Sequence, residues 1–537
     1  MDAKTQKTNL SGSNIYKLCF SFIIFSYCAF LSNNSIGAAL DNKTGTMWSP
    51  YTEWSVENPT YAGNPFDLIS TVTFTHTQTG ATHKTEMFYV GGTTWKFRFT
   101  GTKTGAWTFL SSSTDPDHNG LTGTVTISAN SNPDTTGFLV PSGNKFAKQV
   151  GVDGAIKSFL LNIYMNHVDF DVNGQIGIYD TATINNYLDD AQSMGFDAVF
   201  LSVLNNWFDI NAITYDQHTS TNPDPRTFER LEELITTAHA RGMHVHLWAW
   251  GDDSRRWTQV GVPGGINGTA DKRLQRYIAA RLGPLPSWSI GYGFDLDEWT
   301  TTAQLNEWTT YLNTHSGWPI MAGGRRNDIS GGGSELGYSS HGNQGFQDWY
   351  YDKAVEFMDS NLNRPHLMSE RNVYLRYNES DMNGTRRKMW HYAMAGGHGG
   401  WWGRSFYNNT PYPNPEQLDA HRIFWQVNNR LQLDMSRDNS ITDGFALKNS
   451  SNTNYVIYKE NSNTVLLNLA GMASTQSAIA IDTKKTYLEI DLGTLSTTNQ
   501  TWTAPYSSDW AIAIGDFGNS TPQDTTPPKS PTGATAN

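Results

Sequence analysis

Two glutamates in this sequence, Glu298 and Glu370, have the surroundings expected of a pair of catalytic carboxylates. Each follows an apolar, strand-like run, and the two are 72 residues apart. Two facing carboxyl groups are the minimum equipment for glycoside hydrolysis, because one protonates the leaving oxygen and the other attacks the anomeric carbon or activates water. We therefore predict that this pair hydrolyses glycosidic bonds. Taken singly, either glutamate could equally be a surface residue after a strand.

The neighbours of the two glutamates indicate which role each one has. Arg371 favours an ionised carboxylate at Glu370, as a nucleophile requires. A general acid instead needs a pKa raised by apolar neighbours, and Trp299 follows Glu298 directly. The sequence thus predicts Glu298 as the acid/base and Glu370 as the nucleophile. Asp297 could compete for the same pocket, and we assign it a supporting role beside the substrate.

The elements that must position these residues are apolar strands alternating with amphipathic helices, from about residue 150 to 430. The clearest unit is a helix expected at 225–242, whose apolar residues share one face, followed at once by a strand at 243–248. A strand, helix and strand in this order predict a parallel sheet. Eight candidate strands lie at 159–164, 197–203, 243–248, 289–295, 318–322, 335–340, 366–370 and 391–396.

Eight such units in about 280 residues are what a (β/α)8 TIM barrel requires. A doubly wound sheet is the alternative, but no glycine-rich phosphate loop follows the first strand, which argues against it. The working groups of a barrel lie at the C-terminal ends of its strands. Because Glu298 and Glu370 are about three units apart, we expect them on opposite sides of one barrel mouth.

Other strand ends carry residues suited to line a sugar-binding cleft. Indole rings stack on the apolar face of a pyranose, and arginine binds carboxylate or sulfate oxygens in a bidentate manner. The arginines indicate an anionic sugar, although a structural ion pair would explain each of them equally. The expected substrate-binding residues are Asn205, Trp207, Trp250, Asp297, Trp299, Arg325, Arg326, His341, Arg371, Trp401, Trp402 and Arg404.

No metal or cofactor is expected. His239, His244 and His246 lie around a helix end and a strand, without the helical i, i+4 spacing and glutamate of a zinc site. The glycine-rich segment 396–403 lacks the Lys-Ser/Thr of a phosphate loop, and we interpret it as a loop that approaches a ligand closely. Residues 115–120 match half of a calcium loop, but a hairpin turn is the better interpretation.

Two all-β regions are expected to flank the barrel at 141–432. Short alternating runs separated by Gly, Asn and Pro predict an N-terminal β-sandwich at 40–140, and the same pattern predicts a C-terminal β-sandwich at 433–518. Residues 519–537 are rich in Pro and Thr, and we interpret them as a linker or the start of a truncated module.

The N-terminus resembles a secretory signal peptide over residues 1–39. Its apolar run of about 14 residues is shorter than the roughly 20 that span a bilayer, and small residues follow it as cleavage requires. Both cysteines would leave with it, and the net charge would change from −12 to −14. We expect a secreted protein, extracellular or periplasmic, with no membrane partner. The acidic balance argues against nucleic acid. The oligomeric state is not readable from the sequence.

Three parts of the chain resemble known bacterial polysaccharide hydrolases. Trp54, the segment 64–66, the segment 88–99 and the segment 105–109 resemble the β-sandwich of the domain of unknown function 5060. The Asp297-Glu298 pair and Glu370 are similar to the clan of retaining (β/α)8 glycoside hydrolases, whose usual pair on strand four is Asn-Glu. Here Asp297 replaces the Asn that contacts the sugar 2-hydroxyl in that clan. The C-terminal segment 509–515 also resembles the sandwich that closes such enzymes.

The resemblance implies a substrate class. Enzymes of this layout degrade red-algal galactans and plant pectic side chains, so we expect a carrageenase or an agarase that cleaves β-linkages, with porphyran also considered. The alternatives are a hydrolase of plant cell-wall glycans and a non-catalytic carbohydrate-binding protein on a decayed barrel. A polysaccharide lyase would require a Tyr, His or Lys base beside the residues that neutralise the uronate of its substrate, and no such cluster of residues stands out in the sequence.

Overall fold

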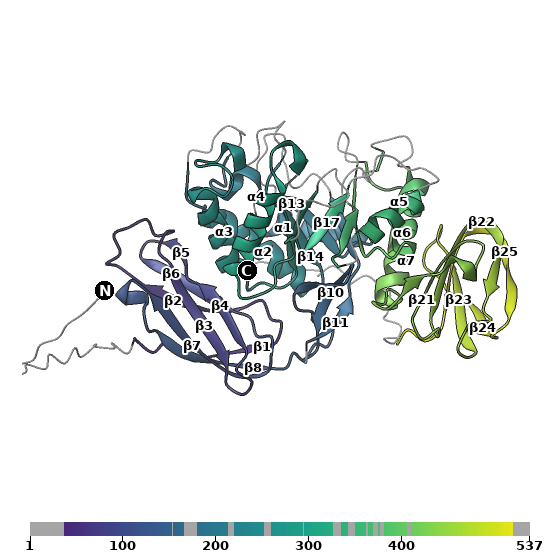
Figure 1. Cartoon of the computed structure of the whole chain (residues 1–537), viewed down its shortest axis with the longest axis horizontal. Helices are drawn as coiled ribbons and strands as arrows, with labels where there is room; N and C mark the ends of the chain where they lie inside the picture. The colour runs from purple at the N-terminus through teal and green to yellow at the C-terminus, as the bar shows by residue number, and fades with distance from the viewer. Residues whose placement is uncertain are drawn as a thin grey trace, which may run out of the picture. The chain divides into compact units, whose positions relative to one another are not determined.

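Eight parallel strands close into a barrel, as the alternation of strands and helices predicts (Figure 1). Each strand pairs with its neighbours in chain order, and the first pairs with the last. The closed ring excludes the doubly wound alternative. The strands are β12 (Leu161–Met165), β13 (Ala198–Ser202), β14 (His244–Trp248), β15 (Trp288–Gly291), β16 (Ala322–Arg325), β17 (Tyr338–His341), β18 (His366–Met368) and β19 (Gly399–Gly403).

The computed structural model describes residues 37–518, except 153, 166–179, 213–219, 252–258, 294, 326–334, 342–349, 361–362, 369–373, 376–380 and 405–409. These residues belong to one compact unit that begins at Gly37. No helix within those ranges combines the length and the apolar character needed to cross a bilayer.

Helices follow the barrel strands and pack on their outer face. In the second of them Asp224 caps the N-terminus, accepting the N–H of Arg226, and Pro225 occupies the first turn, where no intrahelical donor is needed. The helices are α1 (Thr181–Ser193), α2 (Pro225–Ala240), α3 (Thr269–Arg281), α4 (Thr302–Thr314), α5 (Tyr350–Ser360), α6 (Met382–Met394) and α7 (Glu416–Arg422).

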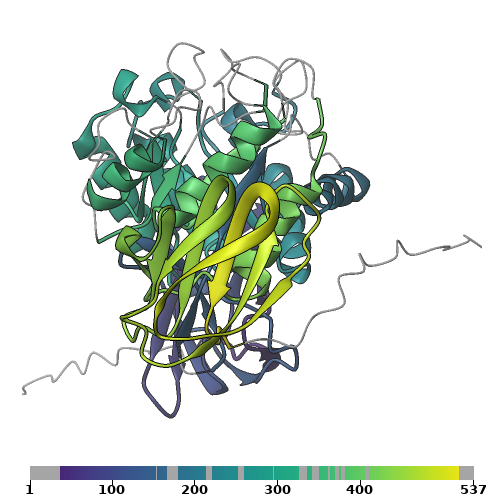
Figure 2. The same ribbon diagram turned by 90° about the vertical axis from the view of Figure 1, so that its right-hand side faces the viewer.

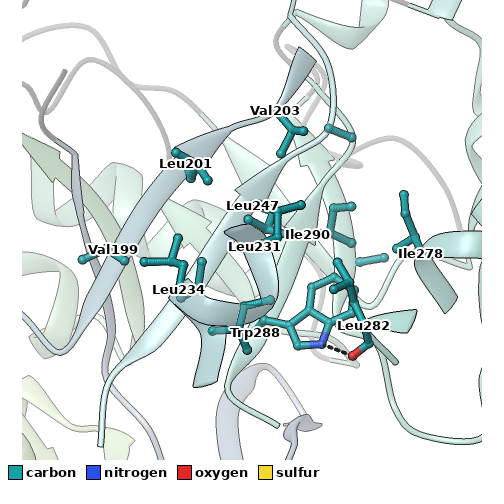
Figure 3. Packing of buried hydrophobic residues seen from close by; sticks show 14 of the residues in the cluster. Val199, Leu201, Val203, Leu231, Leu234, Leu247, Ile278, Leu282, Trp288 and Ile290 are labelled. Atoms are coloured by element: carbon teal, nitrogen blue, oxygen red, sulfur yellow. Dashed lines mark hydrogen bonds between the residues drawn. The ribbon is translucent and has the colours of Figure 1, made fainter. Parts of the chain in front are cut away.

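The core between strands and helices explains why the barrel strands are apolar on both faces. Leu231 and Leu234 of α2 are fully buried beside Val199, Leu201 and other outward residues of β13 to β15 (Figure 3). The inward residues make a second cluster, in which Trp248 stacks on Trp401 with ring centroids 5.0 Å apart. A parallel sheet buried on both faces has this pattern.

The prediction of the eighth strand is wrong. Residues 391–394 end helix α6, and the strand is the glycine-rich segment 399–403. A Cβ on Gly403 would lie 2.5 Å from the backbone oxygen of Met165, and one on Gly399 would lie 3.1 Å from that of Leu161. The glycines therefore allow β19 to pair closely with β12. Glycine is depleted in strands, so the pattern indicated a loop.

The N-terminal region contains two antiparallel sheets that share an aromatic core. One has the order β1-β8-β7-β3-β4 apart from a parallel β1-β8 pair, and the other has the order β2-β6-β5. Trp54 stacks on Phe97 and meets Phe74 and Phe109 within 5.7 Å. The strands are β1 (Lys43–Thr46), β2 (Thr52–Glu57), β3 (Ser70–His76), β4 (Thr82–Glu86), β5 (Phe88–Gly91), β6 (Thr94–Phe99), β7 (Gly105–Ser113) and β8 (Thr122–Ser128).

A small sheet connects this region to the barrel. It consists of β9 (Leu139–Ser142), β10 (Lys145–Val150) and β11 (Ala155–Ser158), in the order β11-β10-β9. Phe146 of β10 is fully buried in the cluster inside the barrel. The predicted boundary at residue 140 lies within β9.

The C-terminal region is one six-stranded sheet with the order β20-β21-β22-β25-β23-β24. Its longest pairing joins β22 and β25, and register shifts interrupt this pairing between Lys459 and Thr464 of β22. The strands are β20 (Ser436–Arg437), β21 (Phe445–Lys448), β22 (Tyr455–Asn468), β23 (Gln476–Asp482), β24 (Ile490–Leu495) and β25 (Asn499–Ile514).

Candidate active site

Glu298 lies on a short turn beyond the C-terminal end of β15. The strand ends at Gly291, earlier than the predicted 295, and Asp295 adopts a left-handed conformation with φ of 38°. A single 3-10 turn, Leu296–Glu298, follows it, and the Glu298 N–H donates to the Asp295 carbonyl over 2.8 Å. The side chains of Asp297 and Glu298 are both exposed, whereas Leu296 is fully buried. The turn thus directs the two carboxylates toward solvent and its apolar residue, Leu296, toward the interior.

Leu296 anchors this turn to the next barrel strand. Its Cδ1 atom lies only 2.2 Å from the position that a Cβ would occupy on Gly324 of β16, so any larger residue at position 324 would force the Leu296 side chain to move. The Tyr292 N–H donates to the Gly323 carbonyl over 2.7 Å, which continues the pairing of the two strands. Two neighbouring glycines of β16 therefore hold the turn that carries Glu298.

An aromatic stack supports the other side of the turn. Trp299 stacks on Tyr292 with ring centroids 5.7 Å apart and an interplanar angle of 13°, and Tyr292 meets Trp308 of α4 edge-on at 4.0 Å. Burial raises the pKa of the Tyr292 hydroxyl well above its usual value, which keeps it neutral. Trp299 is 8% exposed. Aromatic rings therefore pack against one side of the turn, and little of the Trp299 ring is open to a ligand.

Asn205 and Trp207 lie directly after β13, as predicted, on the 3-10 turn Leu204–Trp207. The Trp207 indole N–H donates to the Ala249 carbonyl over 2.9 Å, and its ring packs on Phe228 of α2. Trp207 is fully buried, and Asn205 is 5% exposed. Trp207 therefore joins the ends of two strands to a helix, and the expectation that it stacks on a sugar does not hold. Trp250, which follows β14, is also buried, at 1% exposure.

Trp401 and Trp402 lie within β19 and point to opposite faces of the barrel. Trp401 belongs to the interior cluster, where it contacts Phe200 and Trp248. Trp402 packs on the outside, in the same cluster as Tyr164 beside it, and its indole N–H donates to Asn162 over 3.1 Å. At 1% exposure Trp402 is part of the wall and not of the sugar-binding surface that the sequence predicted.

Arg404 forms the structural ion pair that the sequence left open. Its guanidinium donates to Asp190 of α1 over 2.5 Å, and the same carboxylate accepts the Tyr164 hydroxyl over 2.8 Å. Burial raises the pKa of Tyr164, and the negative charge of Asp190 and this hydrogen bond act in the same direction. The pair fixes the segment after β19 to α1, so Arg404 no longer supports an anionic substrate.

The remaining predicted residues are placed only in part. Arg325 and His341 are the last residues of β16 and β17, at the barrel end where Glu298 lies. Glu370 and Arg371 follow β18 by two and three residues and lie outside the described residues, as does Arg326. In the closed ring β16 and β17 separate β15 from β18, so the two glutamate-bearing strands are well apart around the mouth.

A buried carboxylate that the sequence analysis missed lies in the first turn of α3. Asp271 is fully buried and accepts the Asn267 N–H over 2.7 Å and the Gln275 amide over 3.0 Å, and it also accepts the Gln259 amide. Burial raises the pKa of its carboxyl to about 6, although these hydrogen bonds act in the opposite direction. Asp271 thereby ties the segment 259–267 after β14 to α3. Its only signal in the sequence is an acid after the glycine-rich run 261–268.

The histidines on β14 serve the barrel interior. Both His244 and His246 hydrogen-bond to the Ser289 hydroxyl, at 2.9 and 2.8 Å. Burial lowers the pKa of His246 to about 3, so that its imidazole is neutral. Within the described ranges, no group of three or more His, Cys, Asp or Glu side chains could hold a metal ion.

Comparison with known proteins identifies one domain and the fold. Residues 45–114 match the model of the domain of unknown function 5060 (DUF5060), which confirms the resemblance of the N-terminal region. A search of curated proteins found no match.

The structural neighbours are glycoside hydrolases at low sequence identity. A structure from Bacteroides vulgatus assigned as a glycoside hydrolase aligns with a TM-score of 0.66 at 15% identity, covering 89% of this chain and 100% of its own. A family 5 glycoside hydrolase from the same species has a TM-score of 0.53 at 14% identity, covering 71% and 93%. Another glycoside hydrolase has the same score and identity, covering 71% and 98%. These likenesses concern the fold.

Proposed function

We propose that this chain is a secreted, retaining glycoside hydrolase that cleaves β-linkages in a polysaccharide, with a red-algal galactan of the carrageenan or agar type as its substrate. The observation that carries the proposal is the exposed Asp297-Glu298 turn at the C-terminal end of the fourth strand of a closed barrel. Active sites of such barrels are built at this end. The glycoside hydrolases among the structural neighbours support the same class of activity.

Each glutamate has a defined role in the proposed double displacement. Glu370, after β18, attacks the anomeric carbon and forms a glycosyl-enzyme, while Glu298 protonates the leaving oxygen. Glu298 then takes a proton from water, which attacks the anomeric carbon and releases Glu370. The Leu296 anchor and the stack of Trp299 on Tyr292 give the Glu298 turn a fixed position, and such positioning is worth several kcal/mol in catalysis.

The galactan class rests on the layout of the chain and on its DUF5060 match. The ion pair between Arg404 and Asp190 removes one of the arginines that favoured a sulfated sugar. Neutral and sulfated galactans are therefore both needed in the test.

The test is a screen of the full chain for new reducing ends on agarose, porphyran, κ-carrageenan, β-1,4-galactan and a β-glucan. We expect release of reducing sugars from a galactan without new ultraviolet absorbance. Absorbance from an unsaturated product would indicate a lyase. Binding to a polysaccharide without any product would indicate a carbohydrate-binding protein and would contradict the proposed hydrolysis.

A further inference from the structure

The C-terminal sheet contains a groove that the proposed active site does not use. It has a volume of about 530 Å³ and lies between β24 and the paired ends of β22 and β25. This volume is within the range of small-ligand sites, about 300 to 1,000 Å³. The strands are drawn in yellow-green to yellow in Figure 1 and in Figure 2. Its lining includes Leu467, Asp491, Gln500, Thr501, Trp502 and Thr503.

Trp502 gives the groove an aromatic wall in a fixed position. Its side chain is half-buried, and its ring meets the fully buried Trp510 edge-on, with centroids 5.2 Å apart and an interplanar angle of 87°. Trp502 pairs with Val465 across the strands, and that residue is fully buried in the core of the sheet. A tryptophan held from behind and open in front can present its flat face to a ligand at small entropic cost.

The rim of the groove is polar and carries no positive charge. Thr501 and Thr503 are exposed on β25, and the Gln500 amide donates to the Ser496 carbonyl over 3.3 Å. Asp491 is the only ionisable residue of the lining, and one of its oxygens accepts the Gly493 N–H over 2.8 Å. A single carboxylate without a cation would repel sulfate and uronate groups and would accept hydrogen bonds from hydroxyls.

We infer that this groove binds an uncharged segment of the polysaccharide, apart from the barrel. A sugar ring has an apolar face for Trp502 and equatorial hydroxyls for Asp491, Gln500 and the threonines. This inference rests on the proposed function, because it takes the groove's ligand from the same polymer. Its role is to keep the enzyme on its substrate between cleavage events, since two linked sites raise the local concentration of each for the same chain.

The test is affinity electrophoresis of the full chain in native gels that contain agarose, β-1,4-galactan or κ-carrageenan. All proteins carry Glu298→Gln, so that the gel polysaccharide is not degraded during the run. We expect Trp502→Leu, which keeps apolar bulk but removes the flat face, to weaken retention by a neutral galactan about tenfold. The matched control is Tyr506→Ala, because Tyr506 also packs on Trp510 at 5.2 Å but does not line the groove. Its retention should equal that of the parent protein.

A second variant covers the case in which Trp502→Leu does not fold, as judged by circular dichroism. Gln500→Arg fills the groove from the face that Trp502 shares, because the two residues are two positions apart on β25, and it should also weaken retention by a neutral galactan about tenfold. Retention equal to the parent in both variants would overturn the inference, as would a dependence on Trp502 in κ-carrageenan alone. Hydrolysis by the wild-type chain is measured separately. If the wild-type chain hydrolyses no polysaccharide, the proposed function is refuted. If it does hydrolyse one and both groove variants are retained like the parent, only the inference about the groove is refuted.

Discussion

Replacing Gly324 with alanine should displace the turn that carries Glu298. The new methyl group would lie 2.2 Å from Leu296 Cδ1, whereas ordinary contacts begin at 3.4 Å, so either Leu296 or the strand must move by more than an ångström. Overpacking of this kind costs about 1–3 kcal/mol of unfolding free energy. A misplacement of about 1 Å in an active site can lower turnover about 100-fold. We therefore expect a large loss of kcat with a modest loss of stability.

The assay measures, for the variant and the wild-type chain, kcat on the polysaccharide that the wild-type chain hydrolyses and the midpoint of urea unfolding. Leu296→Ala in the Gly324→Ala background makes room for the new methyl group and should restore part of the lost kcat. Gly471→Ala is the matched control, because a Cβ there meets no atom within 4 Å. Wild-type kcat in Gly324→Ala would refute the idea that the Leu296 contact positions Glu298. An equal loss in Gly471→Ala would show that the effect is not local.

Two further predictions concern stability. The Asp271 carboxyl has a pKa of about 6 against an ordinary 3.8, so its contribution to folding is complete below about pH 3.8 and is lost as pH rises through 6. Between pH 4 and 7 the unfolding free energy of the wild-type chain, measured in urea, should therefore fall by about 3 kcal/mol because of Asp271, and Asp271→Asn should abolish this fall. The same pH dependence in Asp271→Asn would contradict the assignment. Arg98 of β6 makes a bidentate pair with the buried Glu232 of α2, at 2.8 and 3.1 Å. Arg98→Met should therefore cost about 3 kcal/mol, against less than about 1 kcal/mol for Lys96→Met, whose partner Glu53 lies nearer the surface, and equal effects would refute the role given to burial.

The barrel was predictable because its signals are local. Strands buried on both faces are continuous apolar runs, and helices such as α2 show their buried face in the spacing of leucines. β19 was not predictable, because three of its five residues are glycines that serve close packing with β12. The helix before it is buried almost throughout, so α6 lacks the two-faced pattern that identifies a helix.

The strand-end positions of several candidate residues were predictable, but the directions of their side chains were not. A sequence can place Trp207 and Trp402 near strand ends, but it does not show that one supports a helix and the other points outward. The anchor of Leu296 on Gly324 and the ties of Asp271 are contacts between different segments, and no spacing in the sequence reveals them. The ion pair of Arg404 with Asp190 belongs to the same class.

The claim that Glu298 and Glu370 are the catalytic pair is tested most directly by the turnover of Glu298→Gln on the polysaccharide that the wild-type chain hydrolyses. With Glu370→Gln measured beside it, we predict that each variant keeps the wild-type unfolding midpoint and that each loses activity by a factor of about 100 to 10,000, as for a lost general acid or nucleophile. Near wild-type turnover in either variant would contradict the account. Full activity in Glu298→Gln combined with its loss in Asp297→Asn would move the acid role to Asp297.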